Sequence, residues 1–162
     1  MGIGSHTLPN QGATDSWITP RVIVDALGSF DLDPCECIPQ PWKCAERSFT
    51  VDDDGLSREW FGRVWMNPPY SNAERWLEKL AEHGSGTALI FARTETEMFQ
   101  RFVWQRASAI LFLWGRLYFH LPNGMRAKGN SGGPSVLVAY GKSDADQLKQ
   151  SGLRGSFCEG WH

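Results

Sequence analysis

The sequence lacks long hydrophobic runs and has little cysteine and little net charge. Of its 162 residues, 41% are hydrophobic, yet no stretch approaches the roughly 18 apolar residues that a membrane span needs. No basic and apolar leader opens the chain, so we expect a cytoplasmic protein with no membrane partner. Its four cysteines are too few and too unevenly spaced for a disulfide scaffold, which predicts reduced thiols.

The net charge of −2 gives no overall sign of a partner that is a polyanion. The distribution of charge is uneven, however. Residues 1–86 carry 7 Lys and Arg against 13 Asp and Glu, whereas residues 87–130 carry 6 against 2. An acidic part suits a cationic ligand and a basic part suits a phosphate backbone, although mixed surface charge divides in this way by chance about as often.

The length predicts one domain with one core. Residues 1–16 are polar and glycine-rich, typical of a flexible arm, and we expect the domain to span residues 17–150, with a loose tail over 151–162. Helices are predicted after Thr19-Pro20, after a capping box at Ser71–Glu74, after a second one at Thr94–Glu97, and over residues 143–150. Strands are predicted over residues 30–33, 62–66, 87–92, 109–114, 117–120 and 135–140, with an irregular excursion over 34–55. This alternation predicts an α/β sheet with helices on both faces.

The residues with the clearest chemistry are Asn67, Pro68, Pro69 and Tyr70, between a predicted strand and a predicted helix. An open α/β sheet binds ligands at such places, beyond the carboxyl ends of its strands. The prolines remove two backbone donors, so Asn67 and the Pro68 carbonyl are candidate acceptors for both hydrogens of an exocyclic amine. Tyr70 offers a face for a planar base. The competing interpretation is a rigid turn without function.

Asn67-Pro68-Pro69-Tyr70 matches the (Asp/Asn/Ser)-Pro-Pro-(Tyr/Phe) motif of DNA methyltransferases that act on amino groups. The wider chain, over residues 17–141, resembles the phage-type DNA N-6-adenine methyltransferases, called Dam-like. The other segments that carry the resemblance are Trp17-Ile18-Thr19-Pro20, Asp31-Leu32-Asp33-Pro34, Asp53-Asp54-Gly55-Leu56 with Trp60, Trp76, Gly115-Arg116-Leu117-Tyr118-Phe119 and a closing Gly-Pro-Ser-Val strand.

The resemblance implies a Rossmann-like methyltransferase sheet, mostly parallel, with a C-terminal antiparallel strand pair. It also implies S-adenosylmethionine as methyl donor, double-stranded DNA as partner and the adenine N6 amine as acceptor. A target base would have to flip out of the duplex to meet the donor. A phage or prophage gene that acts in a bacterial cytoplasm, for instance in restriction-modification, is a further implication.

The resemblance implies that Thr19, Pro20, Asp33, Pro34, Asp53, Asp54 and Asn67 bind the donor. Thr19-Pro20 would offer a helix N-terminus to the methionine carboxylate, and Asp33 a carboxylate to the ammonium or the ribose. Either Asp53 or Asp54 would bond the donor's adenine amine. The alternatives are a plain helix cap, an Asx turn before Pro34 and an exposed acidic turn.

On the DNA side, Tyr70, Arg116, Arg126 and Lys128 are the predicted substrate-binding residues. Arg126 and Lys128 lie in a glycine-rich stretch, residues 121–133, that suits phosphate contact but is equally typical of a solvated linker. For Arg116, bracing of another side chain is as good an interpretation.

One departure from the pattern concerns the turn after the first strand, where Asp33-Pro34-Cys35-Glu36-Cys37 has none of the glycines that many methyltransferases carry. Cys35, Cys37 and Cys44 fit no common zinc spacing, so no metal is predicted. Rival functions are cytosine-N4 transfer, RNA or protein-glutamine acceptors, and an inactive relative that binds donor or DNA. Such a short chain also leaves open a homodimer that shares the reading of DNA.

Overall fold

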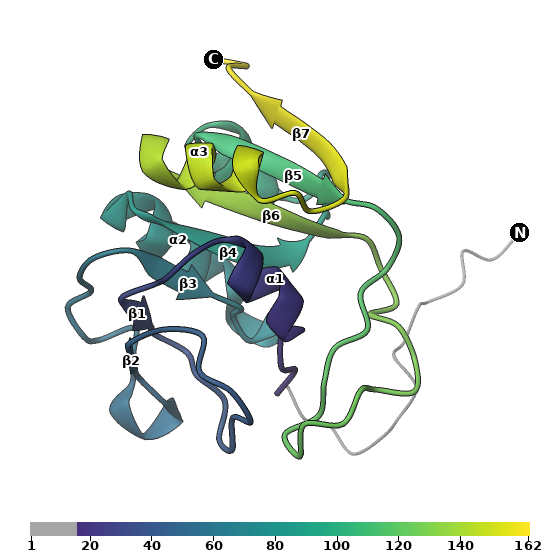
Figure 1. Ribbon diagram of the computed structural model, residues 1–162. Coiled ribbons are helices and arrows are strands. Elements are labelled where there is room, and N and C mark those ends of the chain that lie inside the picture. The colour runs from purple at the N-terminus through teal and green to yellow at the C-terminus, as the bar shows by residue number, and fades with distance from the viewer. Residues whose placement is uncertain (1–15) are drawn as a thin grey trace, which may run out of the picture.

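The computed structural model describes residues 16–162, so nearly all of the predicted N-terminal arm lies outside the described residues. Within that range the chain forms one seven-stranded sheet in the order β2-β1-β3-β4-β6-β5-β7 (Figure 1). The strands are β1 (Leu32–Asp33), β2 (Arg47–Ser48), β3 (Val64–Met66), β4 (Gly86–Phe91), β5 (Ala109–Leu113), β6 (Ser135–Tyr140) and β7 (Gly155–Glu159). The helices are α1 (Arg21–Ala26), α2 (Ala73–His83) and α3 (Lys142–Gln150), with shorter helical segments η1 (Val51–Asp53), η2 (Tyr70–Asn72) and the π-helix η3 (Phe99–Trp104).

The sheet is mixed, so the prediction of a mostly parallel sheet is wrong. Parallel pairs join β1 to β2, β1 to β3 and β3 to β4, but these ladders are short. The long ladders are antiparallel and join β4 to β6, β5 to β6 and β5 to β7. The reason is that β6 returns between β4 and β5, and a strand that enters a sheet from its carboxyl edge must run against its neighbours.

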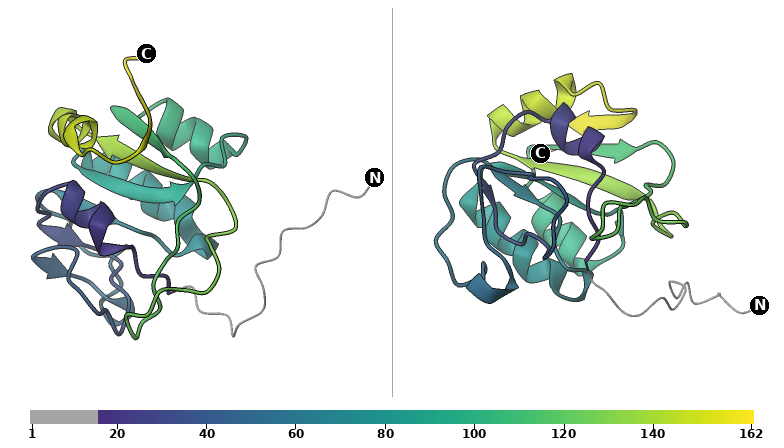
Figure 2. Two further views of the ribbon diagram at one scale, coloured as in Figure 1. Left: turned by 45° about the vertical axis from the view of Figure 1, so that its right-hand side comes forward. Right: turned by 60° about the horizontal axis from the view of Figure 1, so that its bottom comes forward.

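The helices lie on both faces of the sheet, as predicted, and Figure 2 shows them on either side. Successive side chains of a strand point to opposite faces, so the strands contribute side chains to two hydrophobic clusters, one on each face of the sheet. On one face, α2 and η3 pack Trp76, Leu80 and Phe102 against residues such as Met66 and Val138. On the other face, α1 and α3 cover a second cluster, which contains Ile23, Val24, Leu27, Trp65, Leu89, Leu137 and Leu148. The α/β class is therefore confirmed.

Three predicted segments differ from the structure. Residues 117–120 form no strand, because His120 pairs its backbone with Ile18 in an isolated bridge instead. The predicted tail contains β7, which completes the edge of the sheet beside β5. The predicted excursion over 34–55 contains β2 and η1, and η1 is closed by a capping box between Thr50 and Asp53.

The helix starts also differ from those predicted. The residue that caps α1 is Pro20 and not Thr19, and α2 begins after Asn72 without a side-chain cap. Thr96, and not Thr94 as predicted, supplies the capping hydroxyl before η3. Its Oγ1 accepts a hydrogen bond from the Phe99 N–H and donates one to the Arg93 carbonyl. Short turns before these helices shift the first helical residue, so a pattern of capping residues alone does not fix the start.

The pairing fixes the direction of every strand. Because β6 runs against both β4 and β5, strands β1 to β5 all point the same way, and they end at one edge, which we call the carboxyl edge. The loop over residues 114–134 leaves β5 and enters β6 at this edge, where β7 also begins (Figure 1). Among residues 16–162, no helix has the length and apolar character to cross a membrane.

Candidate active site

Asn67 to Tyr70 follow β3 directly and lie at the carboxyl edge. The Asn67 Nδ2 donates a hydrogen bond of 2.8 Å to the Trp17 carbonyl. A carbonyl only accepts hydrogen bonds, so this contact fixes the orientation of the amide and presents Oδ1 on its other side as an acceptor. Pro68 is buried, which anchors the turn, while Asn67, Pro69 and Tyr70 are half-buried.

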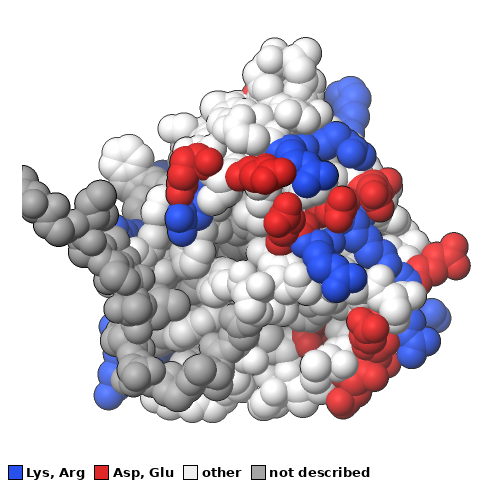
Figure 3. All heavy atoms as spheres, turned by 180° about the vertical axis from the view of Figure 1, so that it is seen from behind, with Lys and Arg blue, Asp and Glu red and all other residues white. Residues whose placement is uncertain are grey.

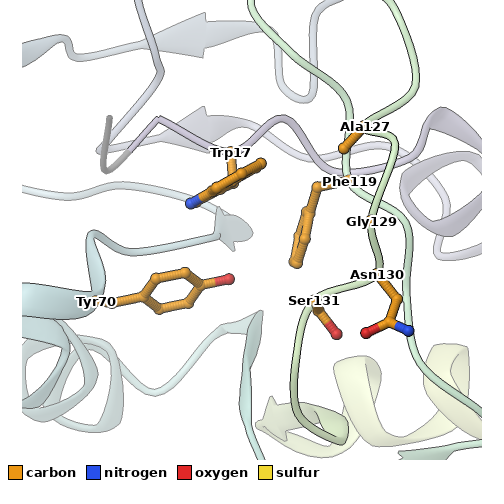
Figure 4. Close-up of a pocket in the computed structure, with 7 residues that line it drawn as sticks. All are labelled: Trp17, Tyr70, Phe119, Ala127, Gly129, Asn130 and Ser131. Carbon is orange, nitrogen blue, oxygen red and sulfur yellow. The ribbon is translucent and has the colours of Figure 1, made fainter. Parts of the chain in front are cut away.

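Beside Tyr70 lies a pocket with aromatic walls, which we call the aromatic pocket (Figure 4). Its lining residues are Trp17, Tyr70, Phe119, Ala127, Gly129, Asn130 and Ser131. The rings of Trp17 and Phe119 have their centroids 6.3 Å apart at an angle of 48°. Figure 4 shows Trp17 and Tyr70 on one side of the cavity, with Phe119, Asn130 and Ser131 facing them. Aromatic walls with a few polar groups suit a planar heterocycle.

Tyr70 is held in this wall by Phe91, the last residue of β4. The two rings stack with a centroid distance of 4.6 Å and an interplanar angle of 23°. Tyr70 is therefore positioned by the neighbouring strand as well as by the turn before it. The turn after β3 thus supplies Tyr70 to the aromatic pocket, and Phe91 at the end of β4 supports the Tyr70 ring.

A larger pocket lies on the other side of the motif, between the turn after β1 and η1. Asn67 and Pro69 belong to its lining together with Ser16, Pro34, Cys35, Glu36, Cys37, Ile38, Thr50, Val51, Asp54, Gly55 and Trp76. The lining contains Glu36 and Asp54 but no Lys or Arg, so we call it the acidic pocket. Its charge suits a cationic ligand.

Asp33 ends β1 beside a small cavity whose lining also includes Thr19, Cys35 and Asn67. Only 4% of its surface is exposed, and burial raises the pKa of its carboxyl to about 7, opposed by the hydrogen bond that the Cys35 N–H donates to Oδ1 at 3.1 Å. No Lys or Arg within residues 16–162 forms an ion pair with it. A buried carboxylate without a cation is a common feature of ligand sites.

The structure separates Asp53 from Asp54, which the sequence leaves equivalent. The Asp53 Oδ2 accepts hydrogen bonds from the Thr50 N–H at 2.8 Å and from Thr50 Oγ1 at 3.0 Å, and these bonds lower the pKa of Asp53. Asp54 has a left-handed backbone, with φ of 51°, and lines the acidic pocket. Asp53 therefore shapes the turn, and Asp54 faces the pocket.

The glycine that is missing after β1 is replaced by one from the opposite side of the acidic pocket. A Cβ on Gly55 would lie 2.0 Å from the Pro34 carbonyl oxygen and 3.2 Å from the Trp76 ring. Only glycine permits this close approach of η1 to the turn after β1. Gly55, which is distant in sequence from the turn after β1, thus allows the backbone to pack closely against that turn.

Thr19 and Pro20 occupy positions different from those expected. Thr19 is 2% exposed, and its carbonyl accepts a hydrogen bond from Trp42 Nε1 at 3.1 Å. Pro20 precedes α1, which is only six residues long. Thr19 and Asp33, which are both predicted to bind the donor, line the same small cavity. Thr19 does so without capping α1.

The cysteines give no sign of a metal centre. Within residues 16–162, no group of three or more His, Cys, Asp or Glu side chains is arranged to hold a metal ion. Cys44 is buried and accepts a hydrogen bond from Gln40, and Cys35 donates one to the Asn67 carbonyl at 3.5 Å. Burial raises the pKa of both thiols.

The basic residues of segment 87–130 divide into two groups. Arg93 and Arg101 are paired with glutamates, and Arg106 donates to the Ala81 carbonyl. Figure 3 shows the same intermixing of both charges on the face seen from behind, where red and blue side chains alternate. Arg116, Arg126 and Lys128 are instead exposed on the loop at the carboxyl edge. The basic surface predicted for residues 87–130 is therefore reduced to the three cations on this loop.

Several lining residues carry no predicted role from the sequence. Trp17 and Phe119 fall inside the matched motifs, whereas Asn130 and Ser131 have no local signal that separates them from other loop residues. Phe91, which stacks on Tyr70, likewise has no local signal that separates it from a core residue. Asn130 and Ser131 meet Tyr70 because the loop over 114–134 folds back across the carboxyl edge, whereas Phe91 meets it from the end of β4.

Known proteins bear out the resemblance. A family model described as DNA N-6-adenine-methyltransferase (Dam) matches residues 4–148. A DNA N-6-adenine-methyltransferase of Escherichia phage T1 is 33% identical over 75 residues, which cover 42% of this chain and 30% of that protein. No solved structure matches the chain significantly. Because the family model matches most of the chain, including both sides of the site, the chain belongs to the DNA N-6-adenine-methyltransferase (Dam) family.

Proposed function

We propose that the chain transfers a methyl group from S-adenosylmethionine to the N6 amine of an adenine in DNA. The observation that carries the proposal is the position of Asn67 to Tyr70 between two pockets. Tyr70 lines the aromatic pocket, and Asn67 and Pro69 line the acidic pocket. A base on one side and a donor on the other would meet at this turn.

The aromatic pocket is the proposed site of a flipped adenine. Tyr70 and Trp17 would hold the base by stacking, and each such contact contributes about 1–3 kcal/mol. Asn67 Oδ1 and the Pro68 carbonyl would accept the two amine hydrogens. Two acceptors pull the nitrogen toward tetrahedral geometry and free its lone pair, so no side chain has to act as a general base. Positioning and electrostatics then account for most of the catalysis.

The acidic pocket is the proposed donor site, and its residues fit this ligand. It is larger than the aromatic pocket, and among residues 16–162 its lining is free of Lys and Arg. S-adenosylmethionine, when bound, supplies an electrophilic methyl group on a positively charged sulfur. Asp33 would hold a cationic group or ribose hydroxyls, with Thr19, Pro20 and Pro34 shaping the region around it, and Asp54 rather than Asp53 would accept from the adenine amine.

The proposed DNA contacts are Arg116, Arg126 and Lys128 on the loop over 114–134, and Arg126 and Lys128 flank Ala127, which lines the aromatic pocket. Their exposure at the carboxyl edge supports contact with phosphates on either side of a flipped base. Cytosine-N4 transfer uses the same acceptor groups and stays the alternative, as does an inactive relative. The family favours adenine. The proposed setting is a bacterial cytoplasm, and we propose no fixed oligomeric state.

Substitution of Asn67 tests the proposal. We expect Asn67→Ala to lower methyl transfer to DNA by at least about a hundredfold, because it removes a preorganised acceptor, while the donor affinity stays largely unchanged. Transfer is measured with radiolabelled donor, and base analysis of the product identifies N6-methyladenine or N4-methylcytosine. Asn67→Asp is the matched control, since it keeps an acceptor but loses the bond to the Trp17 carbonyl, and we expect an intermediate rate. Full activity of Asn67→Ala would exclude the proposed role of Asn67, and donor binding without any transfer by the unaltered protein would favour the inactive relative.

A further inference from the structure

The carboxyl edge carries four exposed cations without acidic partners. Arg116, Arg126 and Lys128 lie on the loop, and Arg154 lies directly before β7. Within residues 16–162, none of the four forms an ion pair. The loop sequence from 114 to 134 contains no Asp or Glu at all. The loop therefore has a net positive charge, in contrast to the acidic pocket at the same edge.

Two of these cations are held over exposed aromatic rings. The Arg126 guanidinium lies 3.9 Å from the centroid of the Tyr118 ring, and that of Arg154 lies 4.6 Å from the Trp114 ring. Trp114 is 71% exposed, which makes it the second most exposed large hydrophobic side chain of the described residues. Stacking restricts the guanidinium plane but leaves its N–H groups directed outward, which lowers the entropy lost when they bind an anion.

The position of Arg154 depends on β7. In the pairing of β5 with β7, Leu113 lies opposite Gly155, and the Trp114 N–H donates to the Arg154 carbonyl at 2.9 Å. A Cβ on Gly155 would lie 2.2 Å from the Phe112 carbonyl oxygen, so a glycine is required for this close approach. The strand itself contributes few buried side chains, since Phe157 is half-buried and its other four residues are exposed. Its main effect at this edge is to place Arg154 beside Trp114.

We propose that Trp114 and Arg154 form an additional contact for the phosphate backbone of DNA, beyond the loop residues that border the aromatic pocket. The inference rests on the proposed DNA substrate and extends the DNA contact to Arg154, which lies beyond residue 148, where the match of the family model ends. Arg154 contacts phosphate directly, and Trp114 is a positioning residue that orients the guanidinium.

The geometry of the sheet supports one continuous DNA surface. Strand β7 lies three strands from β4, which carries Phe91, the residue that stacks on Tyr70 of the aromatic pocket. With strands about 4.8 Å apart, this separation is on the order of 14 Å. Duplex DNA carries one charge per roughly 1.7 Å of its axis, so phosphates several nucleotides from the flipped base would reach Arg154.

The test is the salt dependence of DNA affinity, measured by fluorescence anisotropy with a labelled duplex of about 20 base pairs. We expect Arg154→Ala to bind about three- to tenfold more weakly at low salt and to reduce the slope of log K against log salt by about 1. Trp114→Ala should reproduce part of this loss, Trp114→Phe should restore affinity, and the effects of Trp114→Ala and Arg154→Ala should not add. Lys142→Ala, at the opposite edge, is the matched control and should leave the slope unchanged.

The outcomes separate this inference from the proposed function. An Arg154→Ala slope equal to that of the unaltered protein, with methyl transfer intact, overturns the contact alone. A reduced slope supports the contact even if no methyl transfer is found, in which case the proposed function fails by itself. Absence of DNA binding by the unaltered protein overturns both. Thermal unfolding of each variant checks that β7 stays folded, and a lower melting temperature for Arg154→Ala together with an unchanged slope assigns Arg154 to edge stability instead.

Discussion

Two carboxylates are buried at opposite edges of the sheet, and they have different surroundings. Asp144, at the start of α3, is 1% exposed and pairs with Arg63 Nε at 2.7 Å. Thr87 Oγ1 also donates to it at 3.1 Å. Burial raises the pKa of Asp144, and Arg63 and Thr87 oppose that shift. Asp33, at the carboxyl edge, is buried to a similar degree but forms no ion pair with any Lys or Arg of residues 16–162.

The difference indicates which carboxylate belongs to the scaffold. Arg63 also donates to the carbonyls of Leu27 and Ser29 and lies 4.1 Å from the Phe30 ring, so its pair with Asp144 ties α1 to α3. The Asp33 carboxylate instead accepts a hydrogen bond from the Cys35 N–H of its own turn and borders a cavity. A protein keeps such an unpaired buried carboxylate at a cost in stability, and a cationic ligand offsets that cost.

The largest effect is expected where the scaffold pair is broken. Arg63→Met leaves Asp144 buried without a cation and should lower the free energy of unfolding by about 3–5 kcal/mol at pH 8. The loss should shrink as the pH falls, because Asp144 then takes up a proton. Urea unfolding at several pH values measures both effects.

A double substitution is the control for this prediction. Arg63→Met with Asp144→Asn removes both charges and should recover a large part of the lost stability. If the double variant is as unstable as Arg63→Met alone, Arg63 stabilises the fold through its hydrogen bonds to the Leu27 and Ser29 carbonyls and not through its ion pair. The contrast between a paired Asp144 and an unpaired Asp33 would then explain nothing about stability.

A change of opposite sign is expected at Asp33. Its folded pKa of about 7 lies above the ordinary value of 3.8, so the folded state holds a proton that the unfolded state loses between these pH values. Stability therefore falls as the pH rises from about 4 to 7 and stays low above that range. Asp33→Asn removes this penalty and should raise the free energy of unfolding at pH 8 by on the order of 2–4 kcal/mol.

The same variant should bind donor about ten- to a hundredfold more weakly, because a bond to a charged group is lost. Calorimetry at pH 8 measures the affinity, and unfolding at pH 5.5 provides the internal control, since the gain in stability should be smaller there. A variant that gains no stability at pH 8, or binds donor as tightly as the unaltered protein, would contradict the assignment of Asp33.

The smallest effect is expected at Thr87, which adjusts the scaffold pair without breaking it. Thr87→Val removes the hydroxyl that donates to Asp144 and should cost about 1 kcal/mol at pH 8. Thr87→Ser keeps the hydroxyl and should retain that hydrogen bond, which can be compared by thermal unfolding. A loss as large as that of Arg63→Met would mean that the hydroxyl, and not the guanidinium, holds Asp144 in place.

Much of the fold could be predicted because local patterns dominate there. The buried strands β4 and β6 are continuous apolar runs, and α2 carries Trp76, Leu77 and Leu80 on one face. The strand pairing could not be predicted, since it depends on β6 returning between β4 and β5. β7 has mainly exposed side chains, so its sequence carries no apolar pattern that distinguishes it from a tail.

The candidate site shows the same division. Asn67 to Tyr70 are recognisable because a local sequence of prolines builds the turn. Trp17 and Ser131, however, line one pocket with Tyr70 although they are far from it in the chain. Gly55 likewise replaces a glycine expected in the turn after β1, and only its approach to the Pro34 carbonyl shows this.

The sequence alone determined the α/β class, the turn at Asn67 to Tyr70 and the low net charge that first gave no sign of a polyanionic partner. Only the tertiary structure decided that Asp33 is buried without a cation, that Asp54 and not Asp53 faces the acidic pocket, and that Arg154 joins the loop cations at one edge. The physical reason is the distance along the chain over which each interaction acts. Hydrophobic periodicity and proline restraints act within a few residues, whereas burial and the charges that surround a group depend on which distant segments the fold brings together.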